Sequence, residues 1–140
     1  MERLSPQAMQ VVAYARQEAK RSGHQLVGTE HVLLGIARTE DQKVQAHLLQ
    51  VGLTEELVRK AANEIVPSTK QPHMRDDLDF TPRVQRLLTS AFGEADSLSE
   101  TLVQPRHFLI AMLRDDYGIA SRILERTQVN TTVLLKALLK

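Results

Sequence analysis

The feature that most constrains this 140-residue chain is an internal repeat. A Ser-Pro pair at Ser5 is answered by a Thr-Pro pair at Thr81, an offset of 81 − 5 = 76 positions. The same offset relates three further pairs, which are His31 and His107, Leu33 and Leu109, and Thr54 and Asn130. Helical repeats bury their apolar faces against one another. We therefore expect one all-α globule of eight helices, built as two tandem four-helix repeats with pseudo-twofold symmetry.

Helix-capping residues indicate where the helices begin. Ser5 and Thr81 are good N-caps, and each precedes a proline that suits the first helical position. Thr29, Thr54 and Asn130 are expected to cap three further helices. Aromatic residues make up only 4% of the chain, and a core without them favours helices over strands. The expected organisation is a single domain over residues 1–140, with repeat one at about 5–66, a linker at 67–79 and repeat two at about 80–140.

Composition and motifs exclude several classes of function. The net charge is +1 and no basic stripe is interleaved with aromatic residues, so no nucleic-acid partner is expected. Cysteine is absent, which removes disulfides and thiolate metal sites. No phosphate-binding loop or hydrolase motif occurs, so we expect no ATP hydrolysis, no catalytic residue and no cofactor. The N-terminus does not resemble a signal peptide, so a cytoplasmic location and no membrane partner are expected.

The stretch Gly28-Thr29-Glu30-His31 stands directly before a short apolar run. Thr29 is expected to cap and open this helix, and Glu30 suits the positive end of the helix dipole. Two interpretations of Glu30 remain open. It is either a first-turn residue that only matches the dipole, or part of a ligand site. In such a site its carboxylate binds a guanidinium or ammonium while free helix N–H groups bind an anion.

The histidines allow a metal site to be drawn from His24, Glu30 and His31. Adjacent residues on a helix point in different directions, so Glu30 and His31 are expected to be poor joint ligands. The alternative is that His31 and His107 occupy equivalent positions at the starts of two buried helices, where each forms a hydrogen bond with a neighbouring loop. We favour this structural role and expect no bound metal.

Three segments resemble a known family: "RLSPQAMQVVAYARQEAKRSGH", "GHQLVGTEHVLLGIAR" and "FTPRVQRLLTSAFGEA". They are similar to the N-terminal domain of the Clp/Hsp100 unfoldases, most of all the ClpC type. The resemblance implies a small all-α, non-enzymatic module that sits before the ATPase rings. Such a module recruits protein substrates and adaptor proteins, and the motor passes substrates to the ClpP peptidase. The location implied is the cytoplasm, or the plastid stroma if the chain is processed.

The resemblance also implies two candidate binding sites. ClpC-type domains can bind phosphorylated arginine, and the family's glutamate engages the guanidinium near helix N-termini that receive the phosphate. That role carries over to Thr29 and Glu30. It does not carry over to the second copy, where Pro105 and Arg106 replace Thr and Glu, and an arginine repels a guanidinium. One such site per chain is therefore expected.

The second implied site is an apolar patch for adaptors and peptides, formed here by Met1, Leu4 and Phe80, with Gln85 where the family often has lysine. An alternative is that Leu4 and Phe80 only act as hydrophobic staples before the first helix of each repeat. Two alternative functions also remain open. One is a free-standing accessory protein that regulates or stabilises the Clp complex. The other, a helical hydrolase, lacks a recognisable catalytic cluster.

Overall fold

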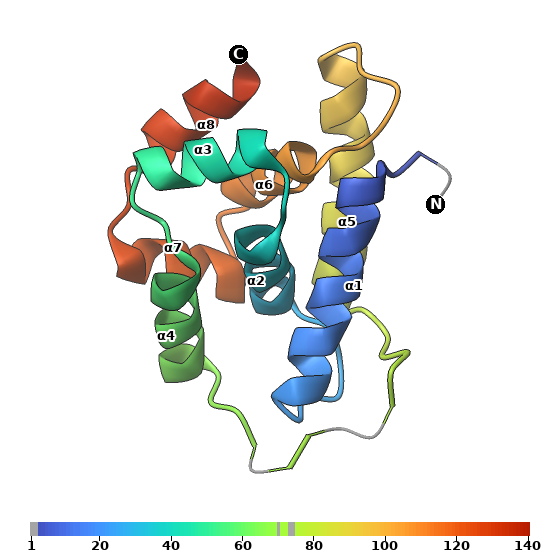
Figure 1. The fold of residues 1–140 in the computed structure, drawn as a ribbon, viewed down its shortest axis with the longest axis vertical. Coiled ribbons are helices and arrows are strands. Elements are labelled where there is room, and N and C mark those ends of the chain that lie inside the picture. Colours follow the sequence, from blue (N-terminus) through green and yellow to red (C-terminus); the bar gives the residue numbers. More distant parts are fainter. Residues whose placement is uncertain (1–2, 70, 73–74) are drawn as a thin grey trace.

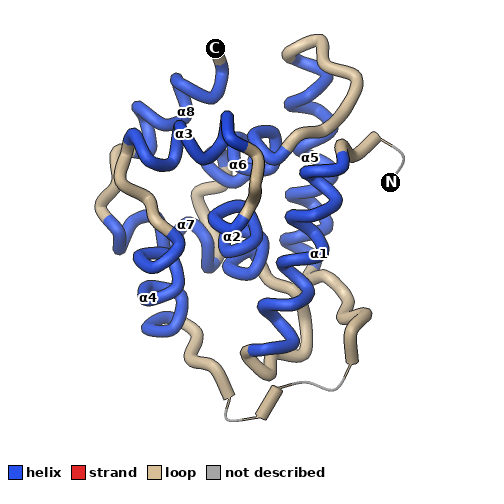
Figure 2. The backbone as a smooth tube through the Cα atoms, viewed as in Figure 1, coloured by secondary structure: helices blue, strands red, loops and turns tan. Residues whose placement is uncertain are grey.

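The computed structural model describes residues 3–69, 71–72 and 75–140, which form eight α-helices (Figures 1 and 2). The helices of the first repeat are α1 (Pro6–Arg21), α2 (Thr29–Arg38), α3 (Gln42–Gln50) and α4 (Glu55–Ile65). Those of the second repeat are α5 (Pro82–Ser97), α6 (Pro105–Arg114), α7 (Ile119–Thr127) and α8 (Thr131–Leu139). The described residues contain no β-strand, so the expected all-α fold is confirmed. None of these helices is long and apolar enough to cross a membrane.

Four of the expected side-chain caps are present. Ser5 Oγ accepts a hydrogen bond from the N–H of Ala8 at 3.0 Å, at the start of α1. Thr54, Thr81 and Asn130 cap α4, α5 and α8 in the same way. In each case the side-chain oxygen accepts a hydrogen bond from the backbone N–H three residues later. Each cap involves residues in one helical turn, which is why the local sequence predicts them.

Helices α2 and α6 form the centre of the molecule (Figure 1). On one side α1 packs against α2 and α5 packs against α6, while elsewhere α4 packs against α7 and α3 against α8. Every residue of α2 from Thr29 to Ala37 is buried, and α6 is buried in the same way from His107 to Met112. This burial explains why the sequence of both helices is so apolar. It also means that Thr29, Glu30 and His31 at the start of α2, and His107 at the start of α6, lie inside the protein.

The two repeats are joined by a reciprocal pair of backbone contacts. Leu4 forms a parallel β-bridge with Val103, and Phe80 forms one with Val27. The two bridges are related by the repeat offset, since 80 − 4 = 76 and 103 − 27 = 76. The Val103 carbonyl accepts a hydrogen bond from the N–H of Ser5 at 2.9 Å, and the Val27 carbonyl accepts one from the N–H of Thr81 at 3.0 Å. Ser5 and Thr81 are the N-caps of α1 and α5. The segment before each repeat's first helix is thus anchored on the other repeat.

A buried ionic cluster holds α1, α4 and the last residue of α2 together. Glu18 is 1% exposed and accepts hydrogen bonds from Arg59 at 2.8 and 3.1 Å and from Arg38 at 2.8 Å. Burial alone would raise the pKa of Glu18. The hydrogen bonds and charges of the neighbouring arginines, Arg59 above all, outweigh burial and hold that pKa below its usual value. Glu18 therefore remains ionised and fixes the position of Arg59 beside the site described below.

Candidate functional site

Gly28, and not Thr29, is the N-cap of α2, so the prediction that Thr29 caps this helix is wrong. Thr29 is the first helical residue and is buried. Its hydroxyl accepts a hydrogen bond from the N–H of Ala120 in the first turn of α7, at 3.1 Å. The N-cap of α7 is Gly118, which has no side chain to offer. Thr29 therefore caps a helix of the other repeat, a contact that no local sequence pattern reveals.

Glu30 is buried, and one of its carboxylate oxygens lacks a hydrogen bond. The residue is 7% exposed, and Oε1 has no partner among the described residues. The carboxylate lies back over Gly28, where a Cβ atom would stand 2.1 Å from Oε1. Burial raises the pKa of Glu30, and its own backbone N–H and the neighbouring His24 oppose part of that rise. The sequence placed Glu30 beside free helix N–H groups but did not indicate that it is enclosed.

The Glu30 side chain lines a cavity of about 250 Å³ between the end of α1, α2 and α4. Leu34 and Val66 contribute apolar wall, while Arg21 and Arg59 bring positive charge to its edge. Arg59 is already bound by Glu18 and Glu55. This cavity, here called the Glu30 cavity, thus combines an unpaired buried carboxylate with arginine side chains that an anionic group could reach.

The neighbouring histidines form a directed chain of hydrogen bonds. The N–H of Gly28 can only donate, so His31 Nδ1, 2.8 Å away, accepts and the His31 proton lies on Nε2. That proton is donated to His24 Nδ1 at 2.8 Å. The remaining N–H of His24, on Nε2, donates to the carbonyl of Pro67 at 3.1 Å. Every polar atom of both rings is therefore used, and the predicted structural role of His31 is confirmed.

The argument that adjacent residues keep Glu30 and His31 apart is wrong. One ligand atom from each of His24, Glu30 and His31 lies within 4.8 Å of the others, because Glu30 folds back over the start of α2. The hydrogen-bond chain supplies a different reason to assign no metal here. A metal ion on His31 Nε2 would have to displace its proton, and Nδ1 would then have to give up the Gly28 N–H.

Repeat two has the same backbone geometry with different charges. Gln104 is the N-cap of α6, and its N–H donates to His107 Nδ1 at 2.7 Å. His107 Nε2 lies 3.3 Å from Glu100, which stands at the position of His24, since 100 − 24 = 76. Arg106, at the position of Glu30, forms an ion pair with Glu100 and donates to the Leu138 carbonyl at 2.6 Å. The pair His24 and Glu30 is thus replaced by Glu100 and Arg106.

Both capping histidines are neutral near pH 7. Burial lowers the pKa of His31 to about 4, with a smaller contribution from the charge of His24. Burial likewise lowers the pKa of His107 to about 4, assisted by the charge of Arg106. A neutral imidazole is required in each case, because Nδ1 must accept the hydrogen bond of the N-cap residue. The low pKa values therefore follow from the same contacts that begin the two helices.

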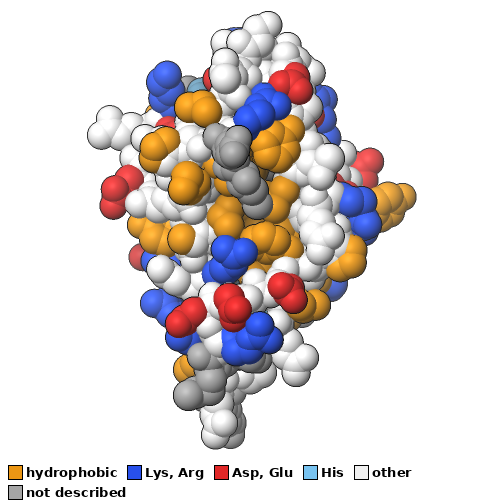
Figure 3. Space-filling model, turned by 90° about the vertical axis from the view of Figure 1, so that its right-hand side faces the viewer, with side chains coloured by type: hydrophobic (Ala, Val, Ile, Leu, Met, Phe, Trp, Pro, Cys, Tyr) orange, Lys and Arg blue, Asp and Glu red, His pale blue; other side chains and the backbone are white. Residues whose placement is uncertain are grey.

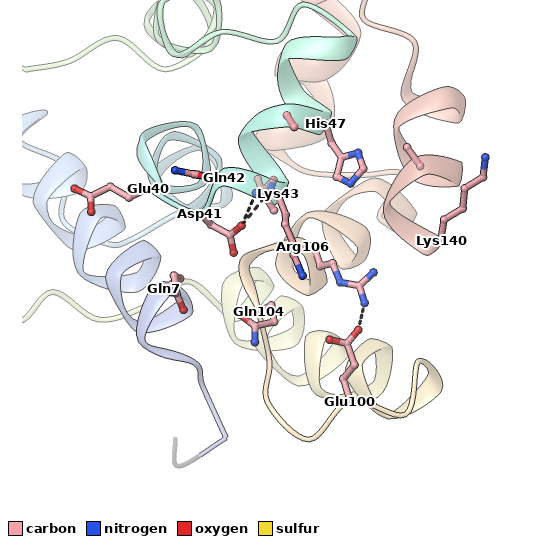
Figure 4. A pocket seen from close by; sticks show the side chains of 13 residues that line it. Gln7, Glu40, Asp41, Gln42, Lys43, His47, Glu100, Gln104, Arg106 and Lys140 are labelled. Atoms are coloured by element: carbon pink, nitrogen blue, oxygen red, sulfur yellow. Dashed lines mark hydrogen bonds and ion pairs between the residues drawn. The ribbon is translucent and has the colours of Figure 1, made fainter.

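A larger groove of about 910 Å³ lies between α3, α6, α8 and the start of α1 (Figure 4). Lys43 and Arg106 extend toward its centre, and His47 and Lys140 lie on its far side. The carboxylate of Asp41 is used to cap α3, where it accepts from two backbone N–H groups. Because the charges are mixed and Arg106 is already paired, we assign no ligand class to this groove.

The residues of the expected apolar patch differ in exposure. Leu4 is 7% exposed and packs in the core, while Phe80 is partly exposed beneath the guanidinium of Arg16, 4.7 Å from its ring centroid. Gln85 is exposed and donates its side-chain N–H to the Phe80 carbonyl at 3.3 Å. Met1 lies outside the described residues. Leu4 and Phe80 each form one of the two β-bridges, and through these bridges they anchor the start of each repeat.

Comparison with known proteins agrees with this architecture. A family model described as the Clp repeat (R) N-terminal domain matches residues 3–127. The chain belongs to this family. Its members are non-catalytic N-terminal domains of Clp ATPases. The family resemblance predicted from the sequence is therefore confirmed.

Two curated relatives show the extent of the match. The chain is 33% identical over 129 residues to the "Negative regulator of genetic competence ClpC/MecB" of Bacillus subtilis, covering 91% of this chain and 16% of that protein. It is 32% identical over 129 residues to the chaperone protein ClpB of Oceanobacillus iheyensis, with the same coverage. The chain thus spans about a sixth of the length of these curated relatives.

Solved structures share the fold. The N-terminal domain of the chaperone ClpD from Arabidopsis thaliana has a TM-score of 0.83 and 27% identity, covering 99% of this chain and 96% of that one. A ClpV N-domain solved in complex with a VipB peptide has a TM-score of 0.71 and 20% identity, covering 96% and 84%. The second likeness supports the fold alone.

Proposed function

We propose that this chain is a non-enzymatic module that recruits protein substrates and adaptor proteins to the AAA+ rings of a ClpC-type ATPase, and through them to the ClpP peptidase. The observation that carries the proposal is an apolar hollow on the side of the molecule where α1 and α5 lie (Figure 3). Exposed apolar surface in one place is typical of protein-binding sites on soluble domains.

The side chains on α1 and α5 suit a peptide partner. Phe80, just before α5, and Phe92, on α5, are both partly exposed, and each ring lies under a guanidinium. Arg16 is 4.7 Å from the centroid of Phe80, and Arg3 is 5.3 Å from that of Phe92. Met9 of α1 is 55% exposed. Apolar surface edged by arginines fits a peptide with apolar anchors and flanking acidic residues, and the ClpV relative binds a peptide.

A comparison of two single substitutions tests the recruitment role. Phe80→Ser removes a partly exposed ring from the α1–α5 side, and Tyr117→Ser removes a 74% exposed ring from the α6–α7 loop. With the 140-residue chain immobilised and lysate proteins captured, Phe80→Ser is expected to lose adaptor and substrate proteins that Tyr117→Ser retains. Thermal unfolding verifies that both variants are folded. Identical captured sets would contradict a binding role for this side of the molecule.

A second candidate function of the same module is recognition of phosphoarginine by the Glu30 cavity. The observation that favours it is the unpartnered Oε1 of Glu30. A guanidinium would supply the missing donors, and the attached phosphate would find positive charge at Arg21 and Arg59 on the cavity edge. Thr29 contributes indirectly, since its hydroxyl holds α7 against the start of α2. Arg106 offers no equivalent acceptor in repeat two.

Titration with free phosphoarginine, followed by backbone amide NMR shifts, tests this candidate. Glu30→Ala is expected to weaken binding by roughly ten- to a hundredfold, because a charge-assisted hydrogen bond contributes about 1.5–3 kcal/mol. Arg106→Ala is the matched variant of repeat two and is expected to leave the affinity unchanged. No shifts near Glu30 would remove the ligand and leave the docking role. Equal shifts around Arg106 would contradict the expectation of one site per chain.

A further inference from the structure

The segment that follows α4 closes one side of the Glu30 cavity. Residues 66–69, here called the 66–69 strap, run from the end of α4 to the end of α1 (Figure 1). Val66 and Ser68 line the cavity itself. The strap therefore stands between the buried carboxylate of Glu30 and solvent on that side.

Few contacts hold the strap in place. The N–H of Thr69 donates to the Ser22 carbonyl at 2.8 Å, and the Thr69 hydroxyl lies 3.3 Å from the same oxygen. His24 Nε2 donates to the Pro67 carbonyl at 3.1 Å, and Ser68 contacts Asn63 at the end of α4. Pro67, Ser68 and Thr69 are all exposed. A segment with exposed hydrogen bonds and little buried apolar surface opens at a small fraction of the cost of global unfolding.

The strap packs against a position that only glycine can occupy. Gly23 has φ +73°, and a Cβ atom there would stand 1.7 Å from Thr69 Oγ1 and 2.4 Å from the carbonyl oxygen of Gln71. A side chain at Gly23 would therefore push the strap outward. Gly52 has the same φ of +73° after α3, yet a Cβ there would meet nothing within 4 Å. The two glycines share backbone strain and differ in contact with the strap.

We propose that the 66–69 strap is a gate over the Glu30 cavity, closed in this structure, and that a cationic group reaches Glu30 only when the strap leaves Ser22 and His24. The proposal rests on the proposed role of Glu30 as the acceptor of a guanidinium. Closure keeps the carboxylate dry and unpaired in the absence of ligand. Because only the open state binds, the apparent affinity is reduced by the fraction of molecules that are open. In repeat two the equivalent residue, Arg106, is already bound by Glu100 and the Leu138 carbonyl, so we propose a gate for repeat one alone.

Gly23→Ala in the 140-residue chain, compared with Gly52→Ala, tests the gate. Both variants acquire a Cβ at positive φ, and only Gly23→Ala displaces the strap. In Gly23→Ala the Thr69 amide is expected to exchange with solvent about tenfold faster than in Gly52→Ala. The pKa of the Glu30 carboxyl, measured by NMR, is expected to fall toward its ordinary value as water enters. Phosphoarginine is expected to bind more tightly, by up to about tenfold.

The outcomes separate the gate from the ligand. If Thr69 exchange, the Glu30 pKa and phosphoarginine affinity are the same in the two variants, the gate is overturned while any binding stands. If Thr69 and Glu30 respond but phosphoarginine binds neither variant, closure by the strap stands and the ligand assignment is overturned. Thr69→Gly, which changes only an exposed strap residue, gives a second test without altering Gly23. It is expected to shift the Glu30 pKa and the phosphoarginine affinity in the same directions.

Discussion

The second residue of the second helix has opposite charges in the two repeats. In repeat two Arg106 is paired with Glu100 and the Leu138 carbonyl, so its charge is satisfied within the chain. In repeat one Glu30 has an oxygen with no partner among the described residues. The capping bonds to His31 and His107 are nevertheless the same, at 2.8 and 2.7 Å. One backbone framework therefore supports both a closed ion pair and a buried carboxylate with one oxygen unpartnered.

A second difference concerns the third helix of each repeat. α3 is capped by its own Asp41, which precedes it in sequence. α7 begins at a glycine without a side chain and takes its cap from Thr29 of repeat one. Repeat one has Thr29 available for this purpose, whereas proline occupies the matching position in repeat two. The comparison shows that the two repeats complete each other and are not independent copies.

The largest expected effect concerns the feature that the repeats share, the buried neutral histidine. The pKa values of about 4 for His31 and His107 lie below the unfolded value of 6.5, so the unfolded chain binds protons first. The contribution of the two neutral histidines to the free energy of unfolding is therefore fully present above about pH 6.5 and is lost as the pH falls toward 4. At about pH 4.5 each histidine is expected to cost roughly 2–3 kcal/mol, as measured by urea unfolding.

Single substitutions assign this pH dependence to each repeat. Glutamine can accept the N-cap N–H at the third helical position, so His31→Gln and His107→Gln keep the cap and remove the titration. Each is expected to remove about half of the histidine contribution. His47→Gln, at a histidine that caps no helix, is the control. If only one variant changes the slope with pH, the two repeats do not share this device.

Exchange of the charged pair is expected to have the next largest effect. Arg106→Glu places a second carboxylate beside Glu100 and removes the donor to Leu138. We expect a loss of about 2–3 kcal/mol, less than for a fully buried pair because both side chains retain some exposure. The double variant Glu100→His with Arg106→Glu reproduces the pair of repeat one and is expected to recover part of the loss. Denaturant unfolding measures both variants. If the double variant is no more stable than Arg106→Glu, the pair of repeat one cannot replace the pair of repeat two.

The cap between the repeats is expected to have a smaller effect. Thr29→Val keeps the volume of a buried side chain and leaves the N–H of Ala120 without its acceptor. The expected loss in the free energy of unfolding is about 1 kcal/mol, and Asp41→Ala is expected to lose a similar amount at α3. The exposed Thr132→Val is the control for the substitution itself. If Thr29→Val is neutral, α7 does not depend on repeat one for its cap.

The smallest expected effect is a change in stability that has opposite signs for substitutions at Glu30 and at Glu100. Burial raises the pKa of Glu30, so its ionised form is disfavoured in the folded state at neutral pH. Glu30→Gln is therefore expected to raise the free energy of unfolding by less than about 1 kcal/mol, seen as a slightly higher melting temperature. Glu100→Gln removes the partner of Arg106 and is expected to lower it. A lower melting temperature in Glu30→Gln would show that the Glu30 carboxylate has a stabilising partner in solution.

The sequence by itself determined the eight helices, four of their side-chain caps and the repeat that relates them. These features depend on residue types within one helical turn, such as Ser5 before a proline or Thr54 before Glu55, so they are visible without a fold. The equivalence of His31 and His107 was also readable, because a repeat places the same residue in the same local surroundings. The family resemblance rested on the same local segments.

Only the tertiary structure decided what Thr29 and Glu30 do. Thr29 contacts a residue 91 positions away, and the burial of Glu30 requires α1, α4 and the 66–69 strap to meet around it. The approach of His24 to His31 likewise depends on how the chain returns from α1 to α2. Whether a carboxylate at a helix start is exposed, paired or enclosed depends on the neighbours that exclude water, and those come from distant parts of the chain.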